Sequence, residues 1–435
     1  MNFPESEAYL YSLGNEVEAM KLGLENITTL LTELGDPNTK YIKVQVAGTN
    51  GKGSVCAFLN SICLEAGIKT GLYTSPHLIS ITERIKINGE DISESEFARL
   101  ATIVRETSES LLSNGKLSHT PTYFEQVTAI GLVAFANAGV ELAILETGLG
   151  GRYDAVTAAN AEIAAITRID LDHQEYLGDT IEEIAAEKAE IITSETQDAV
   201  LGAQSRDVMR ILRKHCRDLG IEPLNDEYAP WRTLLNDDGT VNVELSLYRH
   251  EPIRLGLLGR HQAENAQTAL QIAKALLLQG MFLKFEDGEE EVRIVEGLKK
   301  ARHPGRLEYI DNLLLDGAHN PGGATALRQF LDESERKPIT LVFGSMRDKS
   351  VAEIAEILWP RAERIILTRP SNSRAMTVDE LALFTPNSIM ADKLTKTDDV
   401  AEAIEKAREL TTQDGVILVT GSLYLVGEVK KLLNN

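Results

Sequence analysis

Short runs rich in Val, Ile and Leu alternate with longer helical patterns along most of the chain. In the first two thirds of the sequence the runs cover residues 43–48, 70–75, 141–148 and 162–167. Runs this apolar, separated by segments long enough for a crossover helix, are typical of βαβ units in a parallel sheet that is covered on both faces. The chain is therefore predicted to be an α/β protein.

The same alternation restarts after residues 303–305, His-Pro-Gly, which interrupt a helical pattern. Pro and Gly together disfavour a continuing helix. The later apolar runs cover 313–316, 339–344, 364–368 and 416–421. We therefore predict two domains, residues 1–302 and residues 303–435, the second being a smaller, Rossmann-like α/β domain. Between 240 and 258 the pattern alternates without helices, which predicts a small β insert.

The composition excludes several kinds of partner. The 435 residues include 66 acidic and 44 basic side chains, a net charge of −22. A chain this acidic is a poor match for nucleic acid or an anionic membrane, so a phosphate ligand needs local contacts from backbone N–H groups and a few cations. The sequence shows no leader-like N-terminus and no long apolar run, and Cys56, Cys63 and Cys216 lack metal-binding spacing. We expect reduced thiols, a cytoplasmic location and a monomer.

One segment has the composition and context of a phosphate-binding loop. The apolar stretch 44–47 leads directly into Gly-Thr-Asn-Gly-Lys-Gly-Ser, residues 48–54, and a helical pattern follows. Glycines let consecutive N–H groups face a phosphate chain, Lys52 can reach the β- and γ-phosphates, and the Ser54 hydroxyl can bind Mg²⁺. The common GxxxxGK[ST] pattern does not match, because Gly53 separates Lys52 from Ser54. A glycine-rich turn without a ligand is the alternative. The candidate nucleotide contacts are Thr49, Asn50, Gly51, Lys52, Gly53 and Ser54.

This loop resembles that of the Mur ligase superfamily, and further motifs in the same order are similar to its folate branch, folylpolyglutamate synthase and dihydrofolate synthase. These motifs are Gly23–Asn26, Thr74–Leu78, Tyr123–Glu125, Glu146–Arg152, Leu171–His173, Glu187–Ala189, His261–Gln262, His303–Arg306, Asp316–Pro321 and Gly421–Leu423. The sequence departs from the family pattern at Val156 and Thr157, where Thr and Asn are usual, at Glu190 in place of Gly and at Gly322 in place of His. The resemblance implies a Mur-ligase-like P-loop ATPase domain, a C-terminal ligase domain, and ATP and Mg²⁺ as cofactors.

The resemblance also implies ATP contacts from the far side of the cleft by Asn265, Arg306 and Asp316. Arg306 can neutralise phosphate oxygens, and Asp316 can accept hydrogen bonds from ribose hydroxyls. A surface salt bridge is the alternative for Arg306, and a helix cap is the alternative for Asp316. His319 matches a family position, and we include it with Lys52 and Lys188 among the catalytic candidates without assigning its chemistry.

Five residues are candidate metal ligands: Ser54, Ser75, Glu146, His173 and Lys188. Glu146 ends an apolar run before a glycine-rich loop, so its carboxylate is expected at the ligand-binding edge of the sheet. The roles of the others come from the resemblance. Imidazole is a poor match for Mg²⁺, and a loop histidine bonded to a nearby carboxylate is the alternative for His173.

Lys188 lies in the helical pattern 180–193, which Thr180 and Glu183 open with capping-box spacing. It falls on the apolar stripe of that helix, four residues after Ile184. A lysine whose ammonium reaches back to water is the alternative. The resemblance implies instead that CO₂ carboxylates this lysine, turning it into a metal-facing carboxylate.

For the substrate, the resemblance indicates a pterin-bearing acid bound near Tyr123, Phe124, Arg152 and Asp154, with L-glutamate as second substrate. Aromatic faces and a carboxylate suit a flat heterocycle with N–H donors. Core packing is the alternative for both aromatic residues. The predicted activity is an ATP-dependent amide ligase that forms an acyl phosphate. A peptidoglycan-type Mur ligase and a P-loop kinase or nucleotide-gated binding protein are the alternatives.

Overall fold

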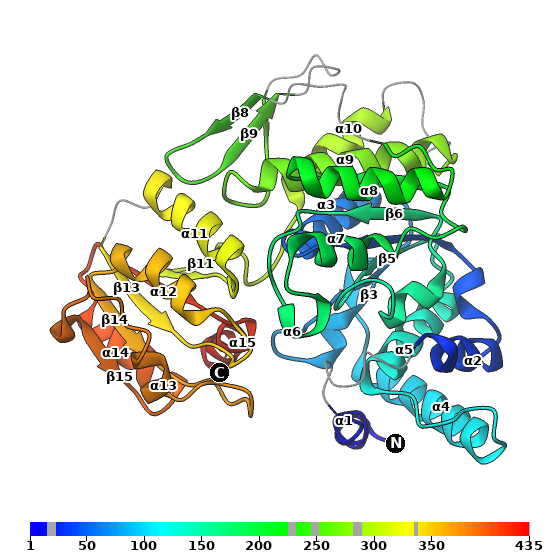
Figure 1. Cartoon of the computed structure of the whole chain (residues 1–435), viewed down its shortest axis with the longest axis horizontal. Coiled ribbons are helices and arrows are strands. Elements are labelled where there is room, and N and C mark those ends of the chain that lie inside the picture. Colours follow the sequence, from blue (N-terminus) through cyan, green and yellow to red (C-terminus); the bar gives the residue numbers. More distant parts are fainter. Residues whose placement is uncertain (15–22, 225–231, 245–251, 282–288, 335–337, 435) are drawn as a thin grey trace. The chain divides into compact units, whose positions relative to one another are not determined.

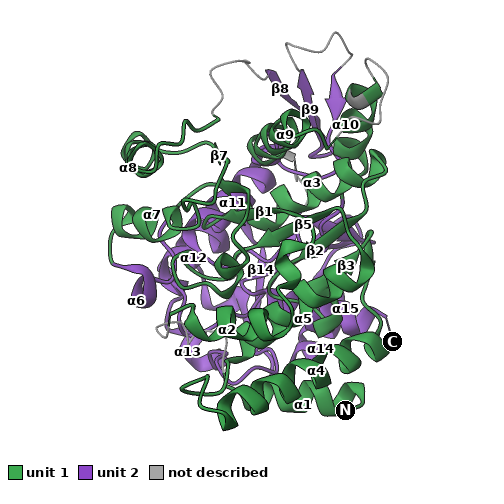
Figure 2. Ribbon diagram, turned by 90° about the vertical axis from the view of Figure 1, so that its right-hand side faces the viewer, with its two compact units in different colours: residues 1–169, 179–228, 264–301 green, residues 170–178, 229–263, 302–435 purple. Residues whose placement is uncertain are grey.

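The computed structural model describes residues 1–14, 23–224, 232–244, 252–281, 289–334 and 338–434 (Figure 1). The chain divides into two compact units (Figure 2). The first contains residues 1–169, 179–228 and 264–301, and the second contains residues 170–178, 229–263 and 302–435. Both units are discontinuous in sequence, whereas the sequence predicted two continuous domains. The predicted domain ranges stay a prediction.

The first unit is built around a seven-stranded sheet. In spatial order its strands are β4 (Glu90–Asp91), β3 (Ile85–Ile87), β2 (Thr70–Tyr73), β5 (Leu142–Glu146), β1 (Ile42–Ala47), β6 (Ile163–Ile166) and β7 (Asp198–Leu201). The five strands from β2 to β7 in this order pair in parallel, and β3 and β4 form an antiparallel edge. The four predicted strands of this part of the chain are confirmed.

Helices pack on both faces of this sheet, as the apolar strands require. On one face α3 (Lys52–Glu65) packs against β1, β2, β5 and α10 (Glu289–Lys300). Alternate residues of β5, Ala143 and Leu145, belong to a core cluster with residues of the helices α1 (Phe3–Ser12), α2 (Glu25–Glu33), α4 (Glu94–Ser113) and α5 (Tyr123–Ala138). Because strand side chains alternate between faces, this cluster covers the face away from α3. The remaining long helices are α7 (Ile181–Ala189), α8 (Arg206–Asp218) and α9 (Gln262–Leu278).

The second unit contains a six-stranded sheet in the order β11 (Glu308–Ile310), β12 (Leu313–Leu315), β16 (Val416–Thr420), β13 (Ile339–Phe343), β14 (Arg364–Leu367) and β15 (Leu394–Lys396). Only β11 is antiparallel among these described strands. Leu314, Leu341 and Phe343 share a buried cluster with residues of α11 (Pro321–Ser334) and α12 (Val351–Leu358). Helices α14 (Val400–Leu410) and α15 (Leu423–Leu433) also pack on the sheet. The four strands predicted here are confirmed.

A separate antiparallel sheet holds β8 (Arg232–Leu235), β9 (Val241–Glu244) and β10 (Ile253–Arg254). The predicted insert at 240–258 thus contains two described strands, while residues 245–251 lie outside the described part of the chain. Of the helices that the structure describes, none has both the length and the apolar character to cross a bilayer. All three cysteines are buried and unpaired.

Candidate active site

The phosphate loop joins the carboxyl end of β1 to the start of α3, as the sequence predicted. Strand β1 ends at Ala47 and α3 begins at Lys52, with Gly51 in a left-handed conformation (φ 91°) at the N-cap. The carboxyl end of a central parallel strand is where open α/β sheets bind ligands. The first turn of α3 adds N–H groups without intrahelical partners and the positive end of the helix dipole. The loop therefore has the setting that a phosphate ligand needs.

Two amides of the loop already have a protein acceptor. Thr49 N and Asn50 N both donate to the carbonyl oxygen of Arg168, at 2.9 and 3.1 Å. The buried Thr167 hydroxyl donates to Asn50 O at 2.8 Å. A Cβ at Gly48 would lie 1.9 Å from that hydroxyl oxygen, so only glycine fits there. The segment after β6 thus holds the loop in shape. The contacts of Thr49 and Asn50 with a nucleotide stay a prediction.

Lys52 folds over the loop from which it starts. Its Nζ donates to Gly48 O at 3.0 Å and to Thr49 O at 3.2 Å. A phosphate chain would offer this ammonium anionic acceptors, which form stronger hydrogen bonds than neutral carbonyls. The positive charge is therefore already placed beside the loop before a nucleotide binds.

Asn265 lies against the same loop. A Cβ at Gly51 would be 2.3 Å from Asn265 Oδ1, and Asn265 is buried in the first unit. The sequence analysis grouped this residue with Arg306 and Asp316 on the far side of a cleft. In the structure helix α9 places Asn265 beside Gly51, whereas Arg306 and Asp316 belong to the second unit. The ATP contacts of these three residues stay a prediction.

Glu146 and Ser75 come together at the carboxyl ends of the neighbouring strands β5 and β2. Glu146 is 6% exposed, and Ser75 N donates to its Oε2 at 3.2 Å. Burial raises the pKa of the Cys56 thiol well above its usual value, and the Glu146 carboxylate raises it further. In the register of β1 and β5 Glu146 pairs with Val46, just before the phosphate loop that leads to Ser54. A carboxylate and two hydroxyls are hard oxygen donors of the kind that Mg²⁺ prefers.

The acidic and sulfur groups do not form a metal site by themselves. Among the residues that the structure describes, no three His, Cys, Asp or Glu side chains surround a common position. The oxygen donors that fit Mg²⁺ are thus those of Glu146, Ser54 and Ser75, and the metal-ligand set proposed from the sequence stays a prediction.

Asp154 organises the turn that follows Glu146. Its carboxylate is fully buried and accepts the backbone N–H groups of Gly148, Leu149 and Val156, each at 2.9 Å. Burial raises the pKa of Asp154 to about 6, although the three amides and Lys188 act in the opposite direction. The side chain therefore shapes the turn, and its contact with a substrate stays a prediction.

The other three substrate candidates differ in accessibility. Arg152 is ion-paired with Glu190 at 2.8 Å and with Glu187 at 3.4 Å. Tyr123 is 2% exposed and its ring stacks on that of Tyr11, with centroids 5.7 Å apart. Its position therefore fits the alternative of a residue packed in the core. The half-buried Phe124 ring lies against the turn, because a Cβ at Gly148 would be 2.6 Å from Phe124 Cζ. Phe124 and Arg152 are the accessible members of this set.

Lys188 is buried on α7. The predicted capping box of Thr180 and Glu183 is present, and Ile184, Ala185 and Ala189 are buried beside the lysine on the same helix. Lys188 is 5% exposed, so the alternative in which its ammonium reaches water does not describe it. The helix also touches the turn, since a Cβ at Gly151 would lie 3.1 Å from Lys188 Cα. Carboxylation of Lys188 stays a prediction.

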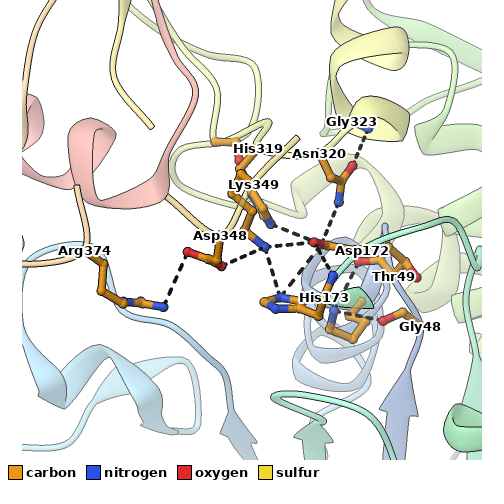
Figure 3. A network of polar contacts seen from close by, with 12 residues as sticks. Gly48, Thr49, Asp172, His173, His319, Asn320, Gly323, Asp348, Lys349 and Arg374 are labelled. Carbon is orange, nitrogen blue, oxygen red and sulfur yellow. Dashed lines mark hydrogen bonds and ion pairs between the residues drawn. The ribbon is translucent and has the colours of Figure 1, made fainter. Parts of the chain in front are cut away.

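A polar network in the second unit surrounds Asp172 (Figure 3). Lys349 Nζ donates to its Oδ1 at 2.8 Å, and Asn320 Nδ2 donates to its Oδ2 at 3.0 Å. Asn320 follows β12 and Lys349 follows β13, so two loops at one sheet edge converge on this carboxylate. Burial by itself raises the pKa of Asp172, but Lys349, His173 and His319 outweigh that effect and hold it far below its usual range.

His173 takes part in this network. Its Nε2 lies 3.1 Å from Lys349 Nζ, and its backbone N donates to Asp172 Oδ1 at 2.9 Å. His173 is therefore a loop histidine close to a carboxylate, as the alternative in the sequence analysis expected. The sequence analysis missed Lys349, although it follows the apolar run 339–344, at the edge where loops carry ligand-binding groups.

His319 is held in one tautomer. Its Nδ1 lies 2.8 Å from the Gly317 carbonyl, which can only accept, so Nδ1 carries the proton. Burial, followed by the charge of Lys349, lowers the pKa of His319 to about 4. The Nε2 atom is then an unprotonated nitrogen 3.7 Å from Asp172 Oδ2.

Asp316 fixes the loop that carries Arg306. Its Oδ2 accepts Leu307 N at 3.0 Å and its Oδ1 accepts Ala318 N at 2.9 Å. Burial raises the pKa of Asp316, and Arg306 opposes the shift. These bonds go to loop amides, so the helix-cap alternative is wrong. Contact with a ribose stays a prediction.

The fold and the phosphate loop at residues 48–54 indicate a nucleotide-dependent ligase. Comparison with known proteins gives the same class. The Mur ligase middle domain matches residues 46–273, and the Mur ligase glutamate ligase domain matches residues 305–423. The dihydrofolate synthase/folylpolyglutamate synthase of Mycobacterium tuberculosis is 33% identical over 441 residues, which cover 94% of this chain and 89% of that protein. The chain therefore belongs to the Mur ligase family, on the branch of folylpolyglutamate synthase and dihydrofolate synthase.

Solved structures of relatives superpose over the whole chain. Mycobacterium tuberculosis folylpolyglutamate synthase complexed with ADP has a TM-score of 0.88 and 30% identity, covering 100% of this chain and 98% of that one. A bifunctional folylpolyglutamate synthase/dihydrofolate synthase with Mn, AMPPNP and L-glutamate bound has a TM-score of 0.82 and 28% identity, covering 100% and 98%.

Other relatives are longer. The probable bifunctional folylpolyglutamate synthase/dihydropteroate synthase of Halobacterium salinarum is 33% identical over 447 residues, which cover 99% of this chain but 51% of that protein. The chain thus spans about half the length of this relative and of its counterpart in Haloferax volcanii.

Proposed function

We propose that the protein is an ATP-dependent ligase that adds L-glutamate to a reduced folate and to dihydropteroate. A carboxylate of the pterin-bearing substrate attacks the γ-phosphorus of ATP, ADP leaves, and an acyl phosphate forms. The glutamate amine then attacks the acyl carbon, phosphate leaves and an amide results. Activation is required because a carboxylate is a poor electrophile.

The observation that carries this proposal is the phosphate loop with Lys52 folded over it, next to the buried Glu146, which pairs with Val46 just before the loop. We assign Lys52 and Arg306 to stabilising the negative charge on the phosphates, because phosphoryl transfer depends mainly on positioning and on charge stabilisation. Ser54, Ser75 and Glu146 would hold Mg²⁺, which supplies further charge stabilisation when bound. A relative solved with Mn, AMPPNP and L-glutamate bound supports a divalent metal, a nucleotide and glutamate as the ligands.

Phe124, Arg152 and the Asp154 turn are assigned to the pterin-bearing substrate, because they lie together in the first unit with the loop that follows Glu146. The three unpaired cysteines support a cytosolic location as part of the same proposal. We propose a monomer as the working form.

Phosphate release tests the proposal against its rivals. The purified protein is given ATP, Mg²⁺, and either dihydropteroate or tetrahydrofolate, with and without L-glutamate. We expect phosphate release only when both a pterin-bearing acid and glutamate are present, together with incorporation of labelled glutamate. Release with a nucleotide-linked muramyl acceptor would indicate a peptidoglycan ligase. ATP turnover that needs neither substrate would indicate a kinase or a nucleotide-gated binding protein.

A further inference from the structure

The ammonium of Lys349 lies at the ring nitrogen through which His173 would bind a metal. Lys349 Nζ is 3.1 Å from His173 Nε2. A lysine ammonium can only donate hydrogen bonds, so His173 Nε2 must accept, and its proton must be on Nδ1. The lone pair on Nε2 is therefore engaged by a cation that belongs to the protein.

Both partners are held in place. Lys349 is 8% exposed at its side chain and is ion-paired with Asp172 at 2.8 Å. His173 has a left-handed backbone (φ 52°), and its own N–H donates to the same carboxylate at 2.9 Å. Asn320 binds the other oxygen of Asp172 at 3.0 Å. The carboxylate therefore fixes the imidazole and the ammonium side by side.

We propose that Lys349 is a built-in competitor for the cation at His173. A metal ion coordinates imidazole through the same unprotonated nitrogen that a hydrogen-bond donor uses, so Lys349 and a metal cannot occupy Nε2 together. Loading of a divalent ion on His173 requires the Lys349 ammonium to withdraw. This inference rests on the proposed function as a metal-dependent ligase and on the expectation from the sequence that His173 is one of the metal ligands.

The surrounding charges are compatible with this exchange. Asp172 keeps its bond from Asn320 when Lys349 withdraws, so its charge is not left without a partner. Asp348 Oδ2 is 3.7 Å from Lys349 Nζ and offers the ammonium a second carboxylate. The His319 Nε2 atom lies 3.7 Å from Asp172 Oδ2. The Lys349 ammonium thus has another carboxylate to bind when it leaves His173 Nε2.

The first test measures Mn²⁺ affinity by electron paramagnetic resonance of free Mn²⁺ in four proteins: the wild type, Lys349→Met, His173→Ala and the double variant. We expect Lys349→Met to bind Mn²⁺ about tenfold more tightly than the wild type, because the competing donor is gone. The same substitution should change nothing in the His173→Ala background. An equal gain in both backgrounds would show a general effect of removing a positive charge and would overturn competition at His173, as would no gain at all.

A second measurement needs no substitution. Nitrogen-15 chemical shifts of selectively labelled histidines report the tautomer of His173 in the metal-free wild type, with His173→Ala used to assign the signal. We expect the Nδ1–H tautomer, and a shift of the Nε2 signal on addition of Mg²⁺. An Nε2–H tautomer would contradict the proposal. Because neither measurement depends on turnover, loss of the proposed ligase activity would leave the result on Lys349 interpretable.

Discussion

The phosphate loop and the network around Asp172 are built in opposite ways. The loop is one continuous stretch, residues 48–54, and its shape depends on backbone contacts and on glycines that no other residue can replace. The network joins side chains from three distant segments, at residues 172–173, 319–320 and 349. A site of the first kind depends on local conformation. A site of the second kind depends on the balance of charges that the fold brings together.

This difference has consequences for perturbation. In the loop, Lys52 is bonded to neutral carbonyl oxygens, so its removal costs little structure but removes the charge that phosphates need. In the network, Asp172 is bonded or close to every other member, so loss of one charge changes the environment of the others. The predictions below test this comparison, from the largest expected effect to the smallest.

Lys52→Ala should abolish turnover without unfolding the protein. We expect at least a ~10³-fold loss of ATP-dependent glutamate incorporation, because phosphoryl transfer depends on placed positive charge. The far-ultraviolet circular dichroism and melting temperature should stay close to those of the wild type. Lys116→Ala, which removes only an exposed ion pair with Glu33, is the matched control. Near-normal turnover by folded Lys52→Ala would refute the role of the loop.

Lys188→Ala should lose about 10²-fold in turnover, because it would remove the metal-facing carboxylate that the family resemblance implies for this lysine. Small carboxylates such as acetate should partly restore activity by filling the vacated space. Lys188→Arg should not be rescued, since its guanidinium occupies that space with the wrong charge. Full activity of the alanine variant, or an unmodified amine in a neutral-pH structure of the active enzyme, would exclude carboxylation.

The network should make the second unit sensitive to acid. The pKa of His319 is lowered to about 4 in the folded protein, so the unfolded chain takes up this proton first as the pH falls. The stabilisation from neutral His319 is fully present above the ordinary pKa of about 6.5 and is lost as the pH falls toward 4, by at most ~3 kcal/mol.

Urea unfolding at pH 7 and pH 5 tests this expectation. The free energy of unfolding should fall less between these pH values in His319→Asn than in the wild type, because the asparagine takes up no proton. Identical pH dependence in the two proteins would show that His319 is not held neutral. His261 and His303, whose pKa values are lowered to about 4 and about 3 by burial and Arg306, should add to the acid sensitivity of the wild type.

Thr167→Val should have the smallest effect. It removes the hydrogen bond from the Thr167 hydroxyl to Asn50 O but keeps the size of the side chain, at a cost of about 1 kcal/mol. We expect KM for ATP to rise a few-fold with little change in kcat, since the loop loses one support but keeps Lys52. Thr29→Val on the exposed side of α2 is the control. A large fall in kcat would mean that Thr167 does more than support the loop.

The sequence predicted the central strands well and the peripheral ones poorly. All eight predicted strands are present because strands covered on both faces must be apolar along their length. Strands β3, β4, β7, β8, β11 and β15 were missed, and each is short or mixed in polarity, as for Glu90–Asp91 and Leu394–Lys396. An edge strand needs fewer apolar residues, so its sequence carries little signal.

By itself the sequence determined the α/β class, the phosphate loop between β1 and α3, and the misplaced Lys188 on an apolar stripe. Each of these depends on residues within one stretch, where periodicity and spacing follow directly from strand and helix geometry. Only the tertiary structure decided that Asn265 packs on Gly51 and that Lys349 lies at His173. It also decided that the Arg168 carbonyl accepts hydrogen bonds from the Thr49 and Asn50 amides. Those contacts join residues far apart in the chain, and no local pattern records which loops meet at a sheet edge once the strands have paired.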